Sequence, residues 1–381
     1  MSEISDVLAA IESLRERGER MALATIVAVR GSTYRRPGAR LLVDASGAMT
    51  GNISGGCLEG DVADVANVVM VEGKPRLVNY DLSAEDEAVW GFGLGCNGAI
   101  DVFVEPADRA AEIAGALRMA LEEEQPIASV TVLHSTVPGV EQGARLLVRP
   151  DGSTESGTGD DGLDAAAAKA ALGLLDIGRS EIRRLAGSEG EARAFVEVLE
   201  PPPRLLVCGA GHDAIPVVAA ASSLGWRTFV VDERQVFLTR ERYPGAAGFV
   251  HVERPEDAAK TAGTDERTSV VVMSHNYLRD REYLRSFLGT DVEYLGMLGP
   301  RIRTDRLLDE LRRDGVVPSD EDLAKIHGPA GLDLGSEGPE EIAAAIVAEI
   351  LAVRRAREAG FLRDREGPIH DRTEQHTASG G

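Results

Sequence analysis

The chain has 381 residues, and 63 acidic against 41 basic side chains give it a formal net charge of −22. This length exceeds what a single hydrophobic core usually supports, so we expect two domains. The acidic balance argues against a nucleic-acid-binding or peripheral membrane protein, because both need a positive field. An acidic start, no apolar run near the roughly 20 residues of a membrane helix, and only 3 cysteines predict a cytoplasmic protein without a disulfide framework.

The first half of the chain contains an internal repeat. The hexapeptide Gly38–Val43 recurs identically as Gly143–Val148. Each copy is expected to end in a strand that closes on Glu-Pro, at Glu105-Pro106 and at Glu200-Pro201. Duplication explains the identities better than chance does, so we expect residues 1–200 to form one α+β domain made of two related units.

Two glycine-rich loops with a cysteine occur in the first copy of the repeat and not in the second. A scaffold role should be shared by both copies, so the thiols of Cys57 and Cys96 are candidates for chemistry. Cys57 is expected to open a helix, whose N-terminus favours a thiolate, although Glu59 opposes this effect. The alternative is that both cysteines are unreactive residues of tight turns. Cys208 ends an apolar strand and is expected to be structural.

Four arginines lie in the eleven-residue segment from Arg30 to Arg40. A Gly/Ser/Thr loop with that charge could hold an anionic ligand. Equally, its arginines could offset nearby carboxylates on the surface of an acidic protein.

The proline run Pro201–Pro203 separates the first half from a differently patterned second half. Beyond it, short β-branched runs alternate with helical stretches, which predicts βαβ units and a parallel sheet covered on both faces. We therefore expect a Rossmann-type α/β domain over residues 203–358 and a disordered polar tail over residues 364–381. The expected strands are 204–208, 227–231, 248–252, 269–273 and 293–298, and the expected helices are 213–224, 279–288, 303–313 and 340–354.

The strongest local signal lies at the first of these strands. Gly209 and Gly211 belong to a G-x-G-x-x-A sequence between a strand and a helix, which is the context of a phosphate-binding turn. Asp232 ends the next strand, where an acid that binds a ribose belongs. Asp232 would favour a free 2′-hydroxyl over a 2′-phosphate, a preference that Arg234 could soften. The turn therefore predicts a nucleotide or another phosphate-bearing ligand, unless the domain keeps the turn and binds nothing.

Two further strand ends are expected at the same edge of the sheet. Ser274 and His275 follow one strand, and Gly299 and Arg301 follow the next. Ligands bind outside the carboxyl ends of the strands in open α/β sheets. We therefore expect His275 to act as a general acid or base, and Arg301 either to bind a phosphate or to be a solvated surface residue. His212, within the glycine turn, is expected to hydrogen-bond at the helix start or to act as a base.

These motifs together resemble the XdhC/CoxI family, the accessory proteins that mature xanthine dehydrogenase and related molybdenum hydroxylases. The resemblance covers the chain from about Ile11 to Arg354 and departs from the family pattern at Asn97 and Ala330. The matching segments are Gly31-Ser32, Pro37-Gly38, Ser54-Gly55-Gly56-Cys57-Leu58-Glu59, Gly95-Cys96, Gly209-Ala210-Gly211-His212, Val231-Asp232-Glu233-Arg234, Ser274-His275 with Asp280, Tyr294-Leu295-Gly296, Leu298-Gly299 and Pro329-Ala330-Gly331-Leu332-Asp333.

The resemblance implies a carrier rather than a turnover enzyme. Such a protein binds the molybdenum cofactor (molybdopterin), protects it, and helps to insert its sulfurated form into a molybdenum hydroxylase of the xanthine or CO dehydrogenase type. Gly55, Gly56 and the thiols of Cys57 and Cys96 are then expected near the molybdenum. A cysteine desulfurase is a further candidate partner, and a homodimer is the expected assembly because closed two-fold assemblies are the commonest.

The residues alone leave two other functions open. One is an NAD(P)-dependent oxidoreductase that rests on Gly209, Gly211 and Asp232, with His275 as general acid or base. Against it, no segment clearly supplies a substrate pocket with its own acid–base set. The other is a nucleotide-binding scaffold without catalysis.

Overall fold

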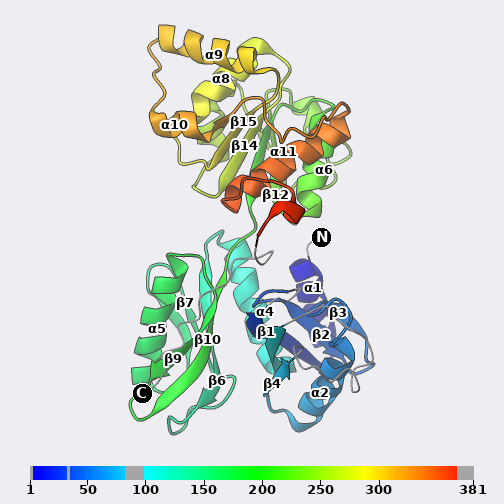
Figure 1. Ribbon diagram of the computed structural model, residues 1–381, viewed down its shortest axis with the longest axis vertical. Helices are drawn as coiled ribbons and strands as arrows, with labels where there is room; N and C mark the ends of the chain where they lie inside the picture. The colour runs from blue at the N-terminus through cyan, green and yellow to red at the C-terminus, as the bar shows by residue number, and fades with distance from the viewer. Residues whose placement is uncertain (1–2, 32–34, 82–97, 367–381) are drawn as a thin grey trace. The chain divides into compact units, whose positions relative to one another are not determined.

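The computed structural model describes residues 3–31, 35–81 and 98–366. Contacts between residues divide the chain into two compact units, Glu3–Pro201 and Pro202–Gly367, coloured blue to green and green to red in Figure 1. Cys96, most of its glycine loop, and the predicted disordered tail from residue 367 on lie outside the described residues. No helix in the described part of the chain is both long and apolar enough to cross a membrane.

The first unit consists of two antiparallel five-stranded sheets with the same strand order, β3-β2-β1-β5-β4 and β8-β7-β6-β10-β9. This shared order confirms the predicted duplication. The first repeat comprises α1 (Glu3–Glu16), β1 (Met21–Gly31), β2 (Arg40–Asp44), β3 (Met49–Gly51), α2 (Glu59–Glu72), β4 (Arg76–Asp81) and β5 (Gly98–Pro106). The second comprises α4 (Ala107–Glu122), β6 (Ile127–Ser135), β7 (Arg145–Val148), β8 (Thr154–Gly157), α5 (Asp161–Leu175), β9 (Glu181–Ala186) and β10 (Glu191–Leu199).

The repeated hexapeptide forms the same structure in both copies. Gly38 and Gly143, at its start, have φ angles of 92° and 86°, a left-handed conformation that suits glycine. Because successive side chains of a strand point to opposite faces, alternate residues then enter different cores. Leu41 and Val43 pack with α2, as Leu146 and Val148 pack with α5, whereas Leu42 and Leu147 join a cluster shared by α1 and α4.

One predicted equivalence between the copies is wrong. Thr25 pairs with Phe103 in the first sheet, and Thr131 pairs with Phe195 in the second. Glu105 therefore corresponds to Glu197 and not to Glu200. β10 ends at Leu199, so the second Glu-Pro pair lies beyond the strand.

The second unit contains a six-stranded sheet of order β13-β12-β11-β14-β15-β16 in which all neighbouring strands are parallel. This is the predicted Rossmann-type architecture. Its strands are β11 (Arg204–Cys208), β12 (Arg227–Asp232), β13 (Gly248–His251), β14 (Thr268–Val272), β15 (Tyr294–Met297) and β16 (Ile326–His327). Its α-helices are α6 (Ala214–Ser223), α7 (Ala258–Ala262), α8 (Tyr277–Phe287), α9 (Arg301–Arg313), α10 (Asp320–Lys325) and α11 (Pro339–Arg354).

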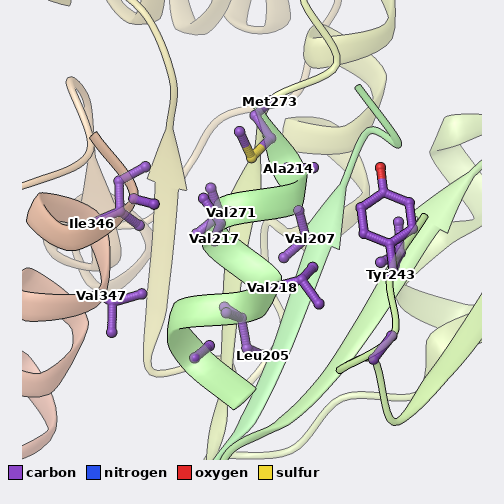
Figure 2. Close-up of a cluster of buried hydrophobic side chains, with 14 of the residues drawn as sticks. Leu205, Val207, Ala214, Val217, Val218, Tyr243, Val271, Met273, Ile346 and Val347 are labelled. Carbon is purple, nitrogen blue, oxygen red and sulfur yellow. The ribbon is translucent and has the colours of Figure 1, made fainter. Parts of the chain in front are cut away.

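The central strand β11 is buried on both faces, as a continuous apolar run predicts. Leu205 and Val207 pack against α6 and α11, with Tyr243 in the same cluster (Figure 2). Leu206 and Cys208 face the other layer, which α8 and α9 cover. Cys208 is fully buried. The two layers fix the carboxyl end of β11, where the glycine turn begins.

Candidate functional site

The glycine turn follows β11 at the point where the strand order of the sheet reverses, because β12 and β14 lie on either side of it. The amide of Gly209 donates to the carbonyl of Val231, 2.8 Å away. Gly209 has a φ of +116°, and a Cβ on it would lie 2.6 Å from the Cα of Ser274. Only glycine allows this approach of two backbones. The turn after β11 and the loop after β14 therefore lie against each other at the carboxyl ends of the strands, where the ligand crevice of an open α/β sheet is expected.

His275 lies against the glycine turn. A Cβ on Gly211 would be 3.6 Å from Cδ2 of this histidine, and His275 Nε2 lies 3.0 Å from Oδ2 of Asp213. The backbone of His275 is left-handed, with a φ of +57°, which is uncommon for a residue other than glycine. The side chain is half exposed. The predicted role of His275 as general acid or base stays a prediction, and its exposed imidazole beside a carboxylate is where that role would be tested.

A buried carboxylate anchors the loop that carries His275. Asp280 is 2% exposed and accepts hydrogen bonds from the backbone amide and the hydroxyl of Ser274, at 3.1 and 2.5 Å. Its other oxygen accepts from Nη2 of Arg303 at 2.6 Å. Ser274 thus supports the loop through its hydroxyl, and Asp280 joins this loop to α9.

Asp232 lies at the end of β12, on the other side of the turn. Its carboxylate accepts from the amide of Ala210 at 2.6 Å and forms an ion pair with Arg234 at 2.8 Å. Burial alone would raise the pKa of Asp232, but the hydrogen bonds from Arg234 and Ala210 outweigh burial and hold this pKa below its usual value. Asp232 therefore stays ionised and holds the glycine turn in place.

The remaining predicted residues of this unit surround the same edge of the sheet. His212 is exposed within the turn. Gly299, with a φ of +111°, precedes α9, and the exposed Arg301 is the first residue of that helix. Within the described ranges, no carboxylate lies within ion-pair distance of Arg301, which leaves its charge available to an anion.

The loop with Cys57 belongs to the first unit. Gly55 and Gly56 have φ angles of 81° and 112°. The expectation that Cys57 opens a helix is wrong by two residues, since α2 begins at Glu59 with Leu58 as its N-cap. The physical reason is the carboxylate of Glu59, which accepts hydrogen bonds from the hydroxyl of Ser54 and from the amides of residues 53, 54, 56 and 58.

This arrangement determines what the loop can offer a ligand. The amide of Gly55 donates to Asn52 and that of Gly56 to Glu59, both at 3.0 Å, so neither amide is directed to a ligand. Burial raises the pKa of Glu59, but the hydrogen bonds within the loop outweigh burial and lower it. The thiol of Cys57 is exposed, and a Cβ on Gly56 would meet nothing within 4 Å. The loop therefore presents a thiol with open space beside it.

The arginine-rich segment is engaged in ion pairs at both of its ends. Arg30 pairs with Asp101 at 3.0 Å, and Arg40 pairs with Glu197 at 2.6 Å. These two arginines offset carboxylates, as the second interpretation of the segment supposed. Residues 32–34 between them lie outside the described ranges.

Sequence reasoning missed a group of residues between β12 and β13. Tyr243 donates its hydroxyl to the carbonyl of Gly211 at 2.9 Å, and Arg242 donates to that of Ala210 at 3.4 Å. The guanidinium groups of Arg234 and Arg242 both lie over the ring of Phe237. The signal was a cluster of arginines and aromatic residues soon after the ribose-type acid. In the described ranges, no group of three His, Cys, Asp or Glu side chains is arranged to hold a metal ion.

Comparisons with known proteins agree with both units. The family model described as "XdhC Rossmann domain" matches residues 205–350, and that described as "XdhC and CoxI family" matches residues 14–81 and 120–186. A Bacillus subtilis protein described as a probable subunit of xanthine dehydrogenase is 32% identical over 352 residues, which are 91% of this chain and 96% of the relative. The Escherichia coli "Molybdenum cofactor insertion chaperone PaoD" is 24% identical over 91% of this chain and 86% of its own length.

A solved structure is similar along almost the whole chain. The crystal structure described as a xanthine dehydrogenase from Bacillus halodurans has a TM-score of 0.72 and 30% identity, and the match covers 94% of this chain and 97% of that one. The sequence motifs, the duplicated sheets and the parallel Rossmann sheet thus lead to one assignment: the chain belongs to the XdhC and CoxI family.

Proposed function

We propose that the protein is a maturation chaperone that binds the molybdenum cofactor, protects it and inserts its sulfurated form into a molybdenum hydroxylase of the xanthine or CO dehydrogenase type. The observation that carries this proposal is the similarity to a molybdenum cofactor insertion chaperone over 91% of the chain, which includes both units. The protein is then a carrier and not a turnover enzyme. A cysteine desulfurase is a proposed further partner, and a homodimer is the proposed assembly.

The chemistry of the Cys57 loop fits such a cofactor. Its thiol is exposed, and the positive-φ backbone at Gly56 leaves open space where a bulky pterin could approach. Thiolates are soft ligands suited to transition metals and to sulfur transfer. We propose that Cys57, with Cys96 as second thiol, holds the molybdenum of the cofactor. This metal is the reactive centre that the cofactor would supply to the hydroxylase.

We assign the crevice of the second unit to a phosphate-bearing ligand. The turn at Gly209 and Gly211 opens α6, whose N-terminus attracts anions. His275 lies over this turn, and Arg301 adds a positive charge at the same edge of the sheet. A phosphorylated pterin and a nucleotide both satisfy these groups.

One observation favours a second candidate function. The contact of His275 with Asp213 across the glycine turn is an arrangement that could serve proton transfer beside a bound nicotinamide dinucleotide. The competing proposal is therefore an NAD(P)-dependent oxidoreductase. A nucleotide-binding scaffold without catalysis is the third outcome.

Gel filtration after incubation with cofactors separates these functions. The chaperone proposal expects pterin fluorescence and molybdenum to elute with the protein, whereas the oxidoreductase expects nicotinamide absorbance. Cys57→Ala should lose molybdenum, and the matched control Cys208→Ala, which removes a buried thiol, should retain it. Retention of molybdenum by neither the wild type nor the control would overturn the proposal.

A further inference from the structure

The carboxylate of Asp232 has no free acceptor position for a ribose. Oδ1 accepts from the amide and the Nε of Arg234, at 2.8 and 2.9 Å. Oδ2 accepts from the amide of Ala210 at 2.6 Å and from Nη2 of Arg234 at 2.8 Å. A carboxylate offers about four acceptor sites, and Asp232 is 2% exposed. A ribose diol could bind this carboxylate only by breaking bonds that hold the glycine turn.

The same bonds fix the side chain of Arg234 beside the carboxylate that holds the glycine turn. Its side chain is 34% exposed, and Asp232 holds one edge of the guanidinium. Among the described residues, no acceptor binds its Nη1. Asp232 is thus a positioning residue, and the donor that it leaves open to a ligand is Nη1 of Arg234.

Arg242 adds a second cation beside the same turn. Its Nη2 donates weakly to the carbonyl of Ala210, and its Nε is buried with no hydrogen-bond partner in the described ranges. No described carboxylate lies within ion-pair distance of this arginine. The guanidinium carbons of Arg234 and Arg242 lie 4.6 and 5.1 Å from the centroid of the Phe237 ring, so one aromatic ring supports both.

Two acidic side chains at this place already have arginine partners. Arg234 neutralises Asp232, and Glu233 between them pairs with Arg279, which leaves the charge of Arg242 without a counterion in the described ranges. The hydroxyl of Tyr243 fixes the segment to the carbonyl of Gly211. Donors held this way bind a phosphate monoester, which carries nearly two negative charges and three strong acceptor oxygens.

We propose that the crevice takes an adenine dinucleotide whose ribose carries a 2′-phosphate, with Nη1 of Arg234 and the guanidinium of Arg242 as the phosphate donors. This replaces the free 2′-hydroxyl that Asp232 alone suggested. The inference rests on the proposed role of the crevice as a phosphate-ligand site. It does not depend on delivery of the molybdenum cofactor.

Titration calorimetry of the full chain with NADP⁺ and NAD⁺ tests the proposal, because these ligands differ only in the 2′-phosphate. NADP⁺ should bind at least about tenfold more tightly, a ratio typical of one added charge-assisted interaction. Arg242→Gln should reduce the ratio to about one, and Arg242→Lys should restore part of it. The control Arg254→Gln, at an exposed arginine paired with Asp257, should keep the wild-type ratio.

Three results would overturn the proposal: NAD⁺ binding as tightly as NADP⁺, binding of neither dinucleotide, or an unchanged ratio in Arg242→Gln. The assay contains neither pterin nor hydroxylase. Its failure would therefore leave the molybdenum retention of the wild type unaffected, and the two proposals fail separately.

Discussion

Nη2 of Arg40 lies 2.7 and 2.6 Å from the two carboxylate oxygens of Glu197, a residue 157 positions further along the chain. The repeat-equivalent pair, Arg145 and Glu105, has the same arrangement at 2.8 and 3.0 Å. All four side chains are buried. Each repeat thus contributes one arginine and one glutamate to the other. The cluster of Val27, Phe103, Leu133 and Phe195 lies in the same interface.

Breaking one of these pairs should destabilise the first unit. Arg40→Met leaves the carboxylate of Glu197 buried without its partner, which costs about 3–5 kcal/mol. The double variant Arg40→Met/Glu197→Leu should recover much of that loss, because it removes both charges. Differential scanning calorimetry measures the change in the free energy of unfolding.

An exposed ion pair provides the control for this experiment. Arg76 pairs with Glu72, and both side chains are 46% exposed, so Arg76→Met should cost about 1 kcal/mol or less. If Arg40→Met costs no more than Arg76→Met, the two repeats do not depend on their reciprocal ion pairs.

The close approach at the glycine turn predicts a large effect of a single methyl group. Gly209→Ala combines a left-handed backbone, about 1–2 kcal/mol, with a methyl 2.6 Å from the backbone of Ser274, about 1–3 kcal/mol more. Gly263→Ala is the matched control, since Gly263 also has a positive φ but a Cβ there meets nothing within 4 Å. Thermal unfolding measures the stability that each variant loses relative to wild type. Equal losses in the two variants would contradict the close approach at Gly209.

The second unit should lose stability in acid through Asp232. Its folded-state pKa lies below its usual value because the hydrogen bonds of Arg234 and Ala210 outweigh burial. Its contribution is therefore present in full above the ordinary aspartate pKa of about 3.9 and is lost as the pH falls through the lower folded-state value. Asp232→Asn should be less stable than wild type at pH 6, and the difference should shrink toward pH 3.

Fluorescence of Trp226, which is 7% exposed in this unit, reports the unfolding by urea in a Trp90→Phe background. The control Asp291→Asn, at an exposed carboxylate of the same unit, should change the stability little at either pH. A stability difference between wild type and Asp232→Asn that stays constant from pH 6 to pH 3 would refute the assignment.

The regular elements were predictable because the spacing of apolar residues and the Gly and Pro residues at element ends determine them. The strand Arg204–Cys208 and the helix after it were expected within one residue of their observed ends. The short elements α7, α10 and β16 were missed, since five, six and two residues carry little periodic signal. The wrong Glu200 equivalence came from matching a dipeptide without knowing the strand register.

The site was predictable in position but not in its hydrogen bonds. The glycine turn and the strand before His275 are local features of the sequence. Because both strands belong to a parallel sheet, their carboxyl ends were expected at the same edge. The saturation of Asp232 by Arg234 and the contact of His275 with Asp213 depend on side-chain conformations that no spacing rule specifies. The same holds for Glu59, whose carboxylate turns back on its own loop and delays the start of α2.

The two described cysteines should differ in reactivity. Cys57 is exposed, whereas burial, with added repulsion from Asp280 and Asp232, raises the pKa of the Cys208 thiol well above its usual value. In the native protein, a disulfide reagent such as DTNB should modify Cys57 rapidly and leave Cys208 unmodified. Peptide mass spectrometry reads each cysteine separately, and denaturation should make both react. Equal labelling of the two in the native state would contradict the proposed role of the Cys57 loop.

The most direct test of the chaperone proposal is transfer of molybdenum from the loaded chain to a cofactor-free molybdenum hydroxylase. After mixing and separation by gel filtration, metal analysis of both fractions measures the transfer, and hydroxylase activity measures correct insertion. The proposal predicts that molybdenum lost by the chain appears in the hydroxylase, with activity above that given by free cofactor, and that Cys57→Ala supports neither. Molybdenum that stays on the chain, or equal activation without the chain, would contradict it.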